Sequence, residues 1–348
     1  MKFANQLISW YLKNKRDLPW RKTKDPYLIW LSEIMLQQTR VIQGLPYYIT
    51  FTNEFKTVFD LAKADESKVL KLWQGLGYYS RARNLHFTAK HISKEFNGVF
   101  PNNYNELLKL KGIGDYTASA IASVCFDEPV AVVDGNVYRV LARYFGIKTP
   151  INSTKGIKEF KELAQTLIDV SQPGLYNQAI MDFGALQCKP QNPLCESCPF
   201  ADSCISLEKK LTKELPVKEK KIKIKKRYFN FLVTITKDGK TIIEQRKGKG
   251  IWQGLYQFPL IETLNNIDEE TIISSEEFTN LFPSETTISL FNSKEIVHKL
   301  SHQHLFTKFW IVKIDKSLQK TILWKNIKQF PVPVLIDNFL NEYLKGKK

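Results

Sequence analysis

Four of the five cysteines lie within one short segment of the chain. Thiolates spaced in this way can close around one metal centre, and both zinc and a four-iron cluster are chemically possible. In a chain without a secretion signal, such bunching favours metal binding over disulfides. The fifth, Cys125, lies in an apolar helical stretch and is interpreted as a core residue. The clustered residues, with six, two and five residues between them, are Cys188, Cys195, Cys198 and Cys204.

Two carboxylates stand in surroundings of different polarity. Glu33 has apolar residues three and four positions away along a predicted helix, so desolvation would raise its pKa and keep it a proton donor. Asp134 precedes a predicted helix, where backbone N–H groups and the helix dipole would favour its ionised form. Such a pair suits glycosidic cleavage, which needs a proton for the leaving group and a negative charge beside a cationic sugar. The plainer alternatives are a surface glutamate and a helix cap.

A glycine-containing turn joins two predicted helices at residues 110–118. Its glycines allow a tight turn, and the helix that follows would offer free N–H groups to an anion. We therefore expect Lys111, Gly112 and Gly114 to contact a nucleic-acid backbone without reading its sequence. An ordinary turn between two helices is the alternative for this motif taken alone.

The charge of the chain suits a polyanionic partner. The 348 residues carry a formal net charge of +16, and a basic stretch lies between Lys209 and Arg227. No apolar run is long enough to span a bilayer, and residues 1–20 alternate at helical spacing without the apolar core of a signal peptide. We therefore expect a cytoplasmic protein that does not bind membranes.

The hydrophobic period changes once along the chain. Apolar residues recur three and four apart up to about residue 208, which predicts an all-helical domain. We expect a six-helix module at about 25–130 and a cluster module of residues 1–24 plus 131–208. Residues 209–226 are predicted to be a basic linker. Alternating patterns at 227–348, a hairpin turn at 237–240 and a helical end predict an α+β domain.

These motifs together resemble the endonuclease III superfamily of DNA glycosylases, and more narrowly the MutY family of adenine DNA glycosylases. The resemblance covers residues 7–205 and continues into a Nudix-like domain from about 226. It implies a helix–hairpin–helix fold and a [4Fe–4S] cluster on the four cysteines that performs no glycosidic chemistry. The matching runs are 18–21, 32–39, 75–84, 177–179, 252–259 and the cysteine segment.

The resemblance also assigns catalytic roles. It implies that Glu33 protonates N7 of adenine, that Asp134 stabilises the oxocarbenium sugar or briefly bonds to it, and that Asn136 supports the site. Tyr116 matches a tyrosine that assists the pair, and it stands where bifunctional glycosylases carry a Schiff-base lysine. We therefore predict base removal without strand cleavage. Tyr138 replaces a lysine of some members, which makes incidental imine trapping less favourable.

Further residues are implied to bind the DNA and its lesion. A flipped adenine would enter a pocket of Trp20, Arg21, Leu36 and Gln178. The residues implied to wedge into the helix or read the lesion are Gln38, Thr39, Tyr78, Ser301 and His302. Leu300 replaces the usual aromatic residue of the lesion-reading loop, and the second domain lacks the acidic box of a Nudix hydrolase. A metal site on His298, His302 and His304 is the alternative interpretation of that loop.

The expected partner is double-stranded DNA with adenine opposite 8-oxoguanine or guanine. We expect a bacterial, nucleoid-associated monomer. Two other hypotheses remain open. One is a thymine or pyrimidine glycosylase on the same scaffold, against which Glu33 and the second domain argue. The other is a non-catalytic redox or DNA-binding protein, which would need no carboxylate pair.

Overall fold

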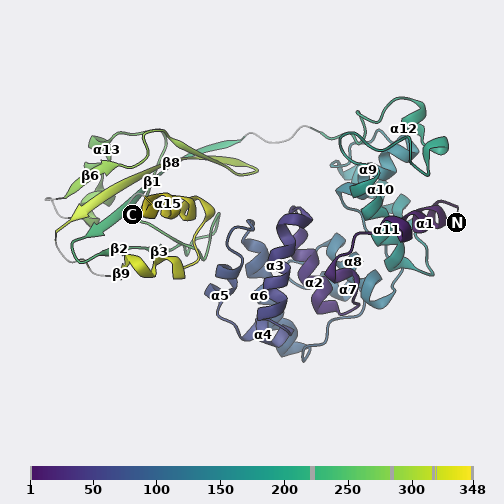
Figure 1. The fold of residues 1–348 in the computed structure, drawn as a ribbon, viewed down its shortest axis with the longest axis horizontal. Helices are drawn as coiled ribbons and strands as arrows, with labels where there is room; N and C mark the ends of the chain where they lie inside the picture. The colour runs from purple at the N-terminus through teal and green to yellow at the C-terminus, as the bar shows by residue number, and fades with distance from the viewer. Residues whose placement is uncertain (1, 220–223, 283–285, 316–317, 319, 346–348) are drawn as a thin grey trace. The chain divides into compact units, whose positions relative to one another are not determined.

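The computed structural model describes residues 2–219, 224–282, 286–315, 318 and 320–345 of the chain (Figure 1). The expected basic linker at 209–226 thus lies partly outside the described residues. The chain divides into two compact units. Unit 1 comprises residues 1–63 and 84–220, and unit 2 comprises residues 64–83 and 221–348.

Unit 1 is built of helices, as the apolar spacing predicts. Many of them begin at a side chain that caps the first turn, such as Asn103, Asp134 and Ser153. Its longer helices are α1 (Lys2–Asn14), α2 (Pro26–Leu36), α3 (Val41–Glu54), α6 (Ser80–Glu95, from residue 84), α8 (Asp115–Phe126), α9 (Gly135–Phe145), α10 (Thr154–Leu167) and α11 (Pro173–Leu186). The short ones are η1 (Pro19–Arg21), α4 (Val58–Lys63), α7 (Tyr104–Leu108), η2 (Ala201–Ser203) and α12 (Ile205–Glu208).

One hydrophobic core joins the helices that frame the cysteine segment. Buried side chains of α1, α9, α10 and α11 pack together in it, among them Leu7, Val140, Phe160 and Tyr176. Leu215, from the expected linker, is also buried in this core, and Ile151 donates a backbone hydrogen bond to Val217. The first half of that basic stretch is therefore anchored to unit 1.

Unit 2 contains a five-stranded mixed sheet. The long strands β1 (Lys225–Thr236) and β8 (Gln303–Ile314) run parallel at its centre, and the other strands pair with them antiparallel. The outer strands are β5 (Leu260–Thr263), β6 (Thr287–Leu290) and β7 (Ile296–Lys299). Two small pairs complete the strands: β2 (Lys240–Ile242) with β9 (Thr321–Leu323), and β3 (Glu244–Gln245) with β4 (Tyr256–Gln257).

Helices cover both faces of this sheet. On one face Phe309 of β8 stacks on Phe339 of α15 (Val334–Lys345) at 4.2 Å between ring centroids. On the other face Leu232 packs with Ile272 of α13 (Glu269–Ile273) and with α14 (Glu276–Leu281), as alternation along a strand requires. Figure 1 shows α15 beside β1 and β8. An η3 turn (Trp324–Gln329) precedes α15. The expected α+β fold of this region is confirmed.

The predicted hairpin at 237–240 is only half right. The turn forms, with the Gly239 amide bonded to the Thr236 carbonyl and the Lys240 amide bonded to the Thr236 hydroxyl. The strand that follows, β2, pairs with β9 instead of returning along β1. Strand β5 pairs with β1 only at Tyr228–Phe231 and β8 pairs along the whole of β1, whereas β2 leaves the turn to pair with β9.

Residues 64–83 belong to unit 2 because α5 (Glu66–Leu72) and the turn after it pack on the C-terminal segments. Gln74 is the main polar contact: its Nε2 donates to Asp337 of α15 at 3.0 Å, and its Oε1 accepts from the Val332 amide at 3.2 Å. Arg83 donates to the Gln253 carbonyl at 2.7 Å. Apolar residues in this segment recur at helical spacing, as they do on either side of it, so the sequence does not indicate that residues 64–83 belong to unit 2.

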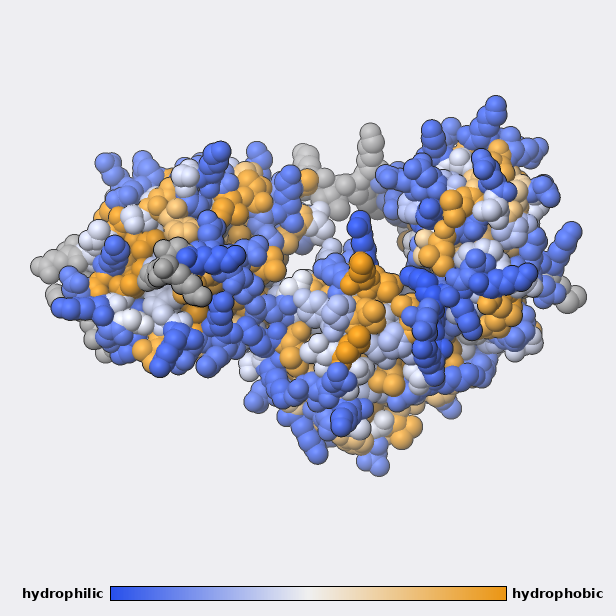
Figure 2. All heavy atoms as spheres, viewed as in Figure 1, coloured by the Kyte–Doolittle hydropathy of each residue, from blue (hydrophilic) through white to orange (hydrophobic). Residues whose placement is uncertain are grey.

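The visible face of each unit is mostly hydrophilic, with separate apolar spots among the polar side chains (Figure 2). Within the described residues, no helix has both the length and the apolar character needed to cross a membrane.

Candidate active site

Glu33 lies on α2, one side of which is buried in unit 1. At the start of the helix the Asp25 carboxylate accepts from the Tyr27 amide at 2.9 Å, and Pro26 takes the first helical position. Neighbours of Glu33 along the helix, Ile29 and Trp30, are fully or almost fully buried. Burial raises the pKa of Glu33 above its ordinary value, although Tyr116 and Arg21 oppose the shift. The Glu33 residue as a whole keeps partial exposure, while its carboxyl group is desolvated.

Tyr116, in the first turn of α8, is the nearest polar partner of Glu33. The two side chains share a hydrogen bond, and burial raises the pKa of Tyr116 far above its ordinary value. The Tyr116 hydroxyl also lies 3.3 Å from the sulfur of Met181, to which it can donate its single hydrogen. When Glu33 is protonated, the Tyr116 oxygen can accept from the Glu33 carboxyl group while the Tyr116 hydroxyl donates to Met181. When Glu33 is ionised, the same hydroxyl can donate to the carboxylate, and in this way Tyr116 opposes the rise that burial causes in the pKa of Glu33.

Asp134 caps α9, and its carboxylate accepts three hydrogen bonds. The amides of Asn136 and Val137 each donate to Oδ1 at 2.8 Å, and Asn136 Nδ2 donates to Oδ2 at 2.7 Å. As the sequence predicts, the backbone N–H groups favour the ionised form, but the sequence did not predict the larger effect of burial. Burial raises the pKa of Asp134, and this outweighs the lowering by the three hydrogen bonds and by Arg139. The carboxylate is thus solvated by fixed donors while it is shielded from water.

Arg139, which sequence reasoning missed, supports Asp134 from the next turn of α9. It is 7% exposed. Its Nη2 donates to Asn136 Oδ1 at 2.8 Å and to the Gly184 carbonyl at 2.6 Å, and its Nε donates to the Cys188 carbonyl at 2.7 Å. A buried arginine on an otherwise apolar helix face was the available signal, because such a side chain must find acceptors inside the protein.

The expected pocket residues fall into two groups. Arg21 and Gln178 are connected through the Tyr11 hydroxyl, which accepts from Arg21 at 3.2 Å and donates to Gln178 at 3.0 Å. Trp20 is instead buried, with its ring packed edge-on against Tyr48 of α3. Leu36, at the end of α2, lies against the same helix α3 at Gly44. Arg21 also lies close enough to Glu33 to lower the pKa of its carboxyl group, which places Arg21 near this candidate acid.

The predicted wedge residues occupy turns. Gln38, just after α2, has a positive φ of 56°, and the Thr39 amide closes the turn on the Leu36 carbonyl at 3.1 Å. Such a turn projects side chains outward, and Gln38 is exposed. In unit 2, Tyr78 also has a positive φ, 49°, and is 49% exposed.

Ser301 and His302, which the sequence predicts to read the lesion, lie in unit 2 at the turn between β7 and β8. Both are exposed, and the Ser301 Oγ is 3.2 Å from the His302 Nδ1. His298, on β7, is half-buried against Trp252, and burial lowers its pKa. The turn therefore presents two small polar side chains to solvent.

The hairpin at Lys111–Gly114 joins α7 to α8 as the sequence predicts. Gly112 has a φ of +83°, and a Cβ there would lie 2.7 Å from Asn84 of α6, so only glycine fits. Gly114 is the N-cap of α8 and has no side chain to occupy the first amides. Lys111 is exposed, and its ammonium group lies 4.3 Å from the ring centroid of Phe87. The hairpin thus offers backbone N–H groups and a fixed cation to an anion.

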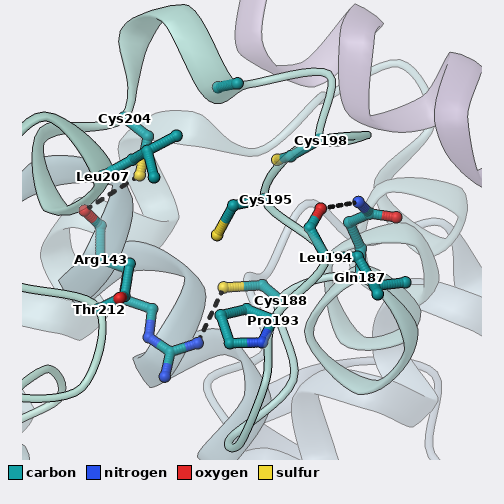
Figure 3. A pocket seen from close by; sticks show the side chains of 11 residues that line it. Arg143, Gln187, Cys188, Pro193, Leu194, Cys195, Cys198, Cys204, Leu207 and Thr212 are labelled. Atoms are coloured by element: carbon teal, nitrogen blue, oxygen red, sulfur yellow. Dashed lines mark hydrogen bonds between the residues drawn. The ribbon is translucent and has the colours of Figure 1, made fainter. Parts of the chain in front are cut away.

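The four clustered cysteines line one pocket, and their sulfur atoms face a common space (Figure 3). None of them forms a disulfide. No set of three or more acidic, histidine or cysteine side chains in the described ranges could hold a single metal ion. Four thiols spread around one pocket are the donor set of a cluster with several metal atoms. These residues therefore fit an iron–sulfur cluster.

Arg143 of α9 holds the cysteine segment in place. It is 3% exposed, and it donates to the carbonyl groups of Lys189, Pro190 and Leu215. Its Nη1 also lies 3.5 Å from the Cys188 sulfur. Arg139 and Arg143, four positions apart on one helix, thus both contact Cys188.

Family models match three parts of the chain. Residues 31–166 match the HhH-GPD superfamily of base excision DNA repair proteins, and residues 230–342 match a NUDIX domain. Residues 188–204, which hold the four cysteines, match the iron–sulfur binding domain of endonuclease III. The fold and the site therefore define a helix–hairpin–helix base-excision repair protein with an iron–sulfur loop and a Nudix-like domain.

Comparison with individual relatives identifies the family within this class. The chain is 38% identical to the adenine DNA glycosylase of Buchnera aphidicola subsp. Baizongia pistaciae over 345 residues, covering 95% of this chain and 94% of the relative. The human adenine DNA glycosylase is 44% identical over 211 residues, 58% of this chain and 39% of the relative. The chain belongs to the adenine DNA glycosylase family.

Solved structures of related enzymes share the helical fold. A thermostable thymine-DNA glycosylase is 33% identical, with a TM-score of 0.55, and covers 60% of this chain and 95% of its own. A non-covalent endonuclease III–DNA complex is 21% identical, with a TM-score of 0.53 and the same coverage. Both cover only about the helical part, whereas the Buchnera relative extends through the second domain.

Proposed function

We propose that this protein is a monofunctional adenine DNA glycosylase, which hydrolyses the N-glycosidic bond of adenine opposite 8-oxoguanine or guanine in double-stranded DNA. The observation that carries the proposal is the pairing of Glu33 with Tyr116 beside the capped carboxylate Asp134. The three groups come from α2, α8 and the start of α9. A desolvated acid next to a fixed carboxylate supplies the two functions that glycosidic cleavage requires.

Each of these residues has one task in the reaction. Glu33, when protonated, donates its proton to N7 of the flipped adenine as the base departs. Asp134, oriented by Asn136 and Arg139, stabilises the oxocarbenium sugar until water attacks. Tyr116 holds the proton of Glu33 and has no amine. It cannot form the Schiff base that strand cleavage needs, so the product is an abasic site in an intact strand.

Other parts of the chain bind the DNA. The hairpin at Lys111–Gly114 holds the backbone, Gln38, Thr39 and Tyr78 enter the helix beside the lesion, and the turn at Ser301 and His302 contacts 8-oxoguanine. The cluster on the four cysteines is of the [4Fe–4S] type; it shapes the loop from Cys188 to Cys204 beside the DNA.

We assign residues 1–208 to the glycosylase domain, 209–226 to a linker and 227–348 to the lesion-reading domain. The protein acts as a monomer on the nucleoid in the bacterial cytoplasm. The relatives from Buchnera, which are bacterial enzymes, support this assignment.

The test is a single-turnover assay on short duplexes that carry adenine opposite 8-oxoguanine, guanine, cytosine or thymine. Each reaction is split and analysed with and without hot alkali. Strand breaks that appear only after alkali, mainly opposite 8-oxoguanine and next opposite guanine, are expected. Breaks without alkali would contradict the role of Tyr116, and excision of thymine instead of adenine would contradict the proposed substrate.

A further inference from the structure

A buried carboxylate on α11 anchors two arginines beside the candidate active site. Asp182 has no solvent exposure. Its Oδ1 accepts from Arg16 at 2.5 Å and from Arg21 at 3.0 Å. Arg21 thus binds Asp182 through Nη2, and its Nη1 donates to the hydroxyl oxygen of Tyr11 of α1 at 3.2 Å.

This arrangement leaves Tyr11 only one hydrogen-bonding pattern. A guanidinium group can only donate, so the Tyr11 oxygen must accept from Arg21. The single hydroxyl hydrogen of Tyr11 then points to the side-chain amide of Gln178, 3.0 Å away. The atom that receives it must be the amide oxygen, because the amide nitrogen has no free electron pair to accept. The hydrogen-bond network of Asp182, Arg21 and Tyr11 therefore fixes the orientation of the Gln178 amide, with its oxygen toward Tyr11.

The environment keeps this pattern intact. Tyr11 is 2% exposed, and burial raises its pKa, so the hydroxyl stays protonated and remains a donor. Gln178 stands one helical turn before Asp182 on α11, and it keeps partial exposure. Its amide oxygen has a second acceptor position, which Tyr11 does not use.

We propose that Tyr11, held by Arg21 and Asp182, is a positioning residue that fixes the Gln178 amide so that its oxygen accepts from the 6-amino group of the target purine. This proposal rests on the proposed function and deepens it. A 6-amino group donates to the fixed oxygen, whereas a 6-oxo group would place one oxygen against another in a desolvated site. The network thus selects a 6-aminopurine and rejects a 6-oxopurine, since a site built for one hydrogen bond disfavours an analogue that cannot form it.

The test compares two target bases, adenine and hypoxanthine, each opposite 8-oxoguanine, in single-turnover assays of the wild-type protein and Tyr11→Phe. The variant removes one hydroxyl and frees the amide to turn its NH₂ group toward the base. The ratio of adenine to hypoxanthine excision should fall by about tenfold or more. The intrinsic reactivity of the two bases cancels when the ratios of the two proteins are compared.

Asp182→Asn is the second variant, because it weakens the anchor of Arg21 while Tyr11 stays in place. The ratio should fall in the same direction. The matched control is Tyr176→Phe on the same helix, whose buried hydroxyl has no hydrogen-bond partner among the residues that the structure describes. This control should keep the wild-type ratio.

A double-mutant cycle separates positioning from a general structural effect. In a Gln178→Ala background, Tyr11→Phe should leave the ratio unchanged, because the amide that it positions is gone. An equal slowing of both bases by Tyr11→Phe, or the same effect with and without Gln178, would overturn the proposal. Failure of the wild-type protein to excise adenine would instead overturn the proposed function, and this proposal with it.

Discussion

Arg139 donates a hydrogen bond from Nε to the carbonyl oxygen of Cys188 at 2.7 Å, and this bond joins helix α9 to the first cysteine of the cluster segment. The same guanidinium donates to Asn136, which in turn donates to Asp134. A continuous chain of hydrogen bonds thus runs from the first cysteine of the segment to the carboxylate of Asp134. The position of Asp134 is therefore linked to the cysteine segment through Asn136 and Arg139.

Replacing Arg139 with Gln should damage both ends of this chain. Two buried carbonyl groups and Asn136 would lose a charged donor, at a cost of about 1–3 kcal/mol for each unsatisfied group. We expect at least a tenfold fall in the single-turnover excision rate and a lower iron content, measured on the same preparation. The control is Lys158→Gln, a charge removal at an exposed position on α10, which should change neither. Full activity with Arg139→Gln would contradict the positioning role.

The raised pKa of Glu33 makes a prediction about stability. The group has a pKa near 4.5 in the unfolded chain and a higher pKa when folded, so the folded state becomes less stable as the pH rises from the lower to the higher value. Above the folded pKa this destabilisation is complete, and each tenfold difference between the two acid dissociation constants corresponds to about 1.4 kcal/mol. Glu33→Gln should therefore unfold at a higher denaturant concentration than the wild type at pH 8, with a smaller gain at pH 4. A gain that is independent of pH would contradict the raised pKa.

The dependence of excision on pH should have two limbs. The reaction needs Glu33 protonated and Asp134 ionised, so the rate should fall at high pH as Glu33 loses its proton and at low pH as Asp134 gains one. Burial raises the pKa of both groups, which moves both limbs above the ordinary carboxyl range. Single-turnover rates between pH 4 and 10 would show this. Absence of the alkaline limb would argue against Glu33 as the acid.

Gly184 is a position where a single methyl group should disturb catalysis. A Cβ there would lie 2.6 Å from the Cβ of Asn136 and 3.0 Å from its carbonyl oxygen. Gly184→Ala must push the first turn of α9, and Asp134 with it, away from α11. We expect a fall in excision rate of about 100-fold, as small displacements of a catalytic group cause, with retained iron. Gly248→Ala, where a Cβ meets nothing within 4 Å, is the control and should be neutral.

The metal assignment predicts a spectrum and a composition. The purified protein should absorb broadly near 400 nm, as iron–sulfur proteins do, and should hold about four iron atoms per chain. Cys195→Ser should lower the iron content and weaken binding to a lesion duplex, because the loop from Cys188 to Cys204 loses its fixed shape. Zinc in place of iron would contradict the assignment.

Local signals predicted the elements of the site. Asp134 predicted the start of α9, and the glycines at 112 and 114 predicted the hairpin. These features are visible in the sequence because a cap or a turn involves residues only a few positions apart.

The supporting network could not be predicted in the same way. Asp182 meets Arg16 and Arg21 across more than 160 residues, and Arg139 meets Cys188 across 49. Such partners depend on how helices pack, which no local pattern specifies. The raised pKa of Asp134 was missed for a related reason: the cap is local, but its desolvation comes from distant parts of the chain. The grouping of residues 64–83 with the second domain is also a result of packing.

The most direct test of the account is the single-turnover excision of adenine opposite 8-oxoguanine by the wild-type protein and by Glu33→Gln. Binding of the same duplex is measured in parallel. Glutamine keeps the size of the side chain and cannot donate the proton. We predict excision by the wild type, a loss of at least about 1,000-fold in the variant, and duplex affinity within a factor of about three. Excision by the variant at the wild-type rate would contradict the role of Glu33 and the mechanism built on it.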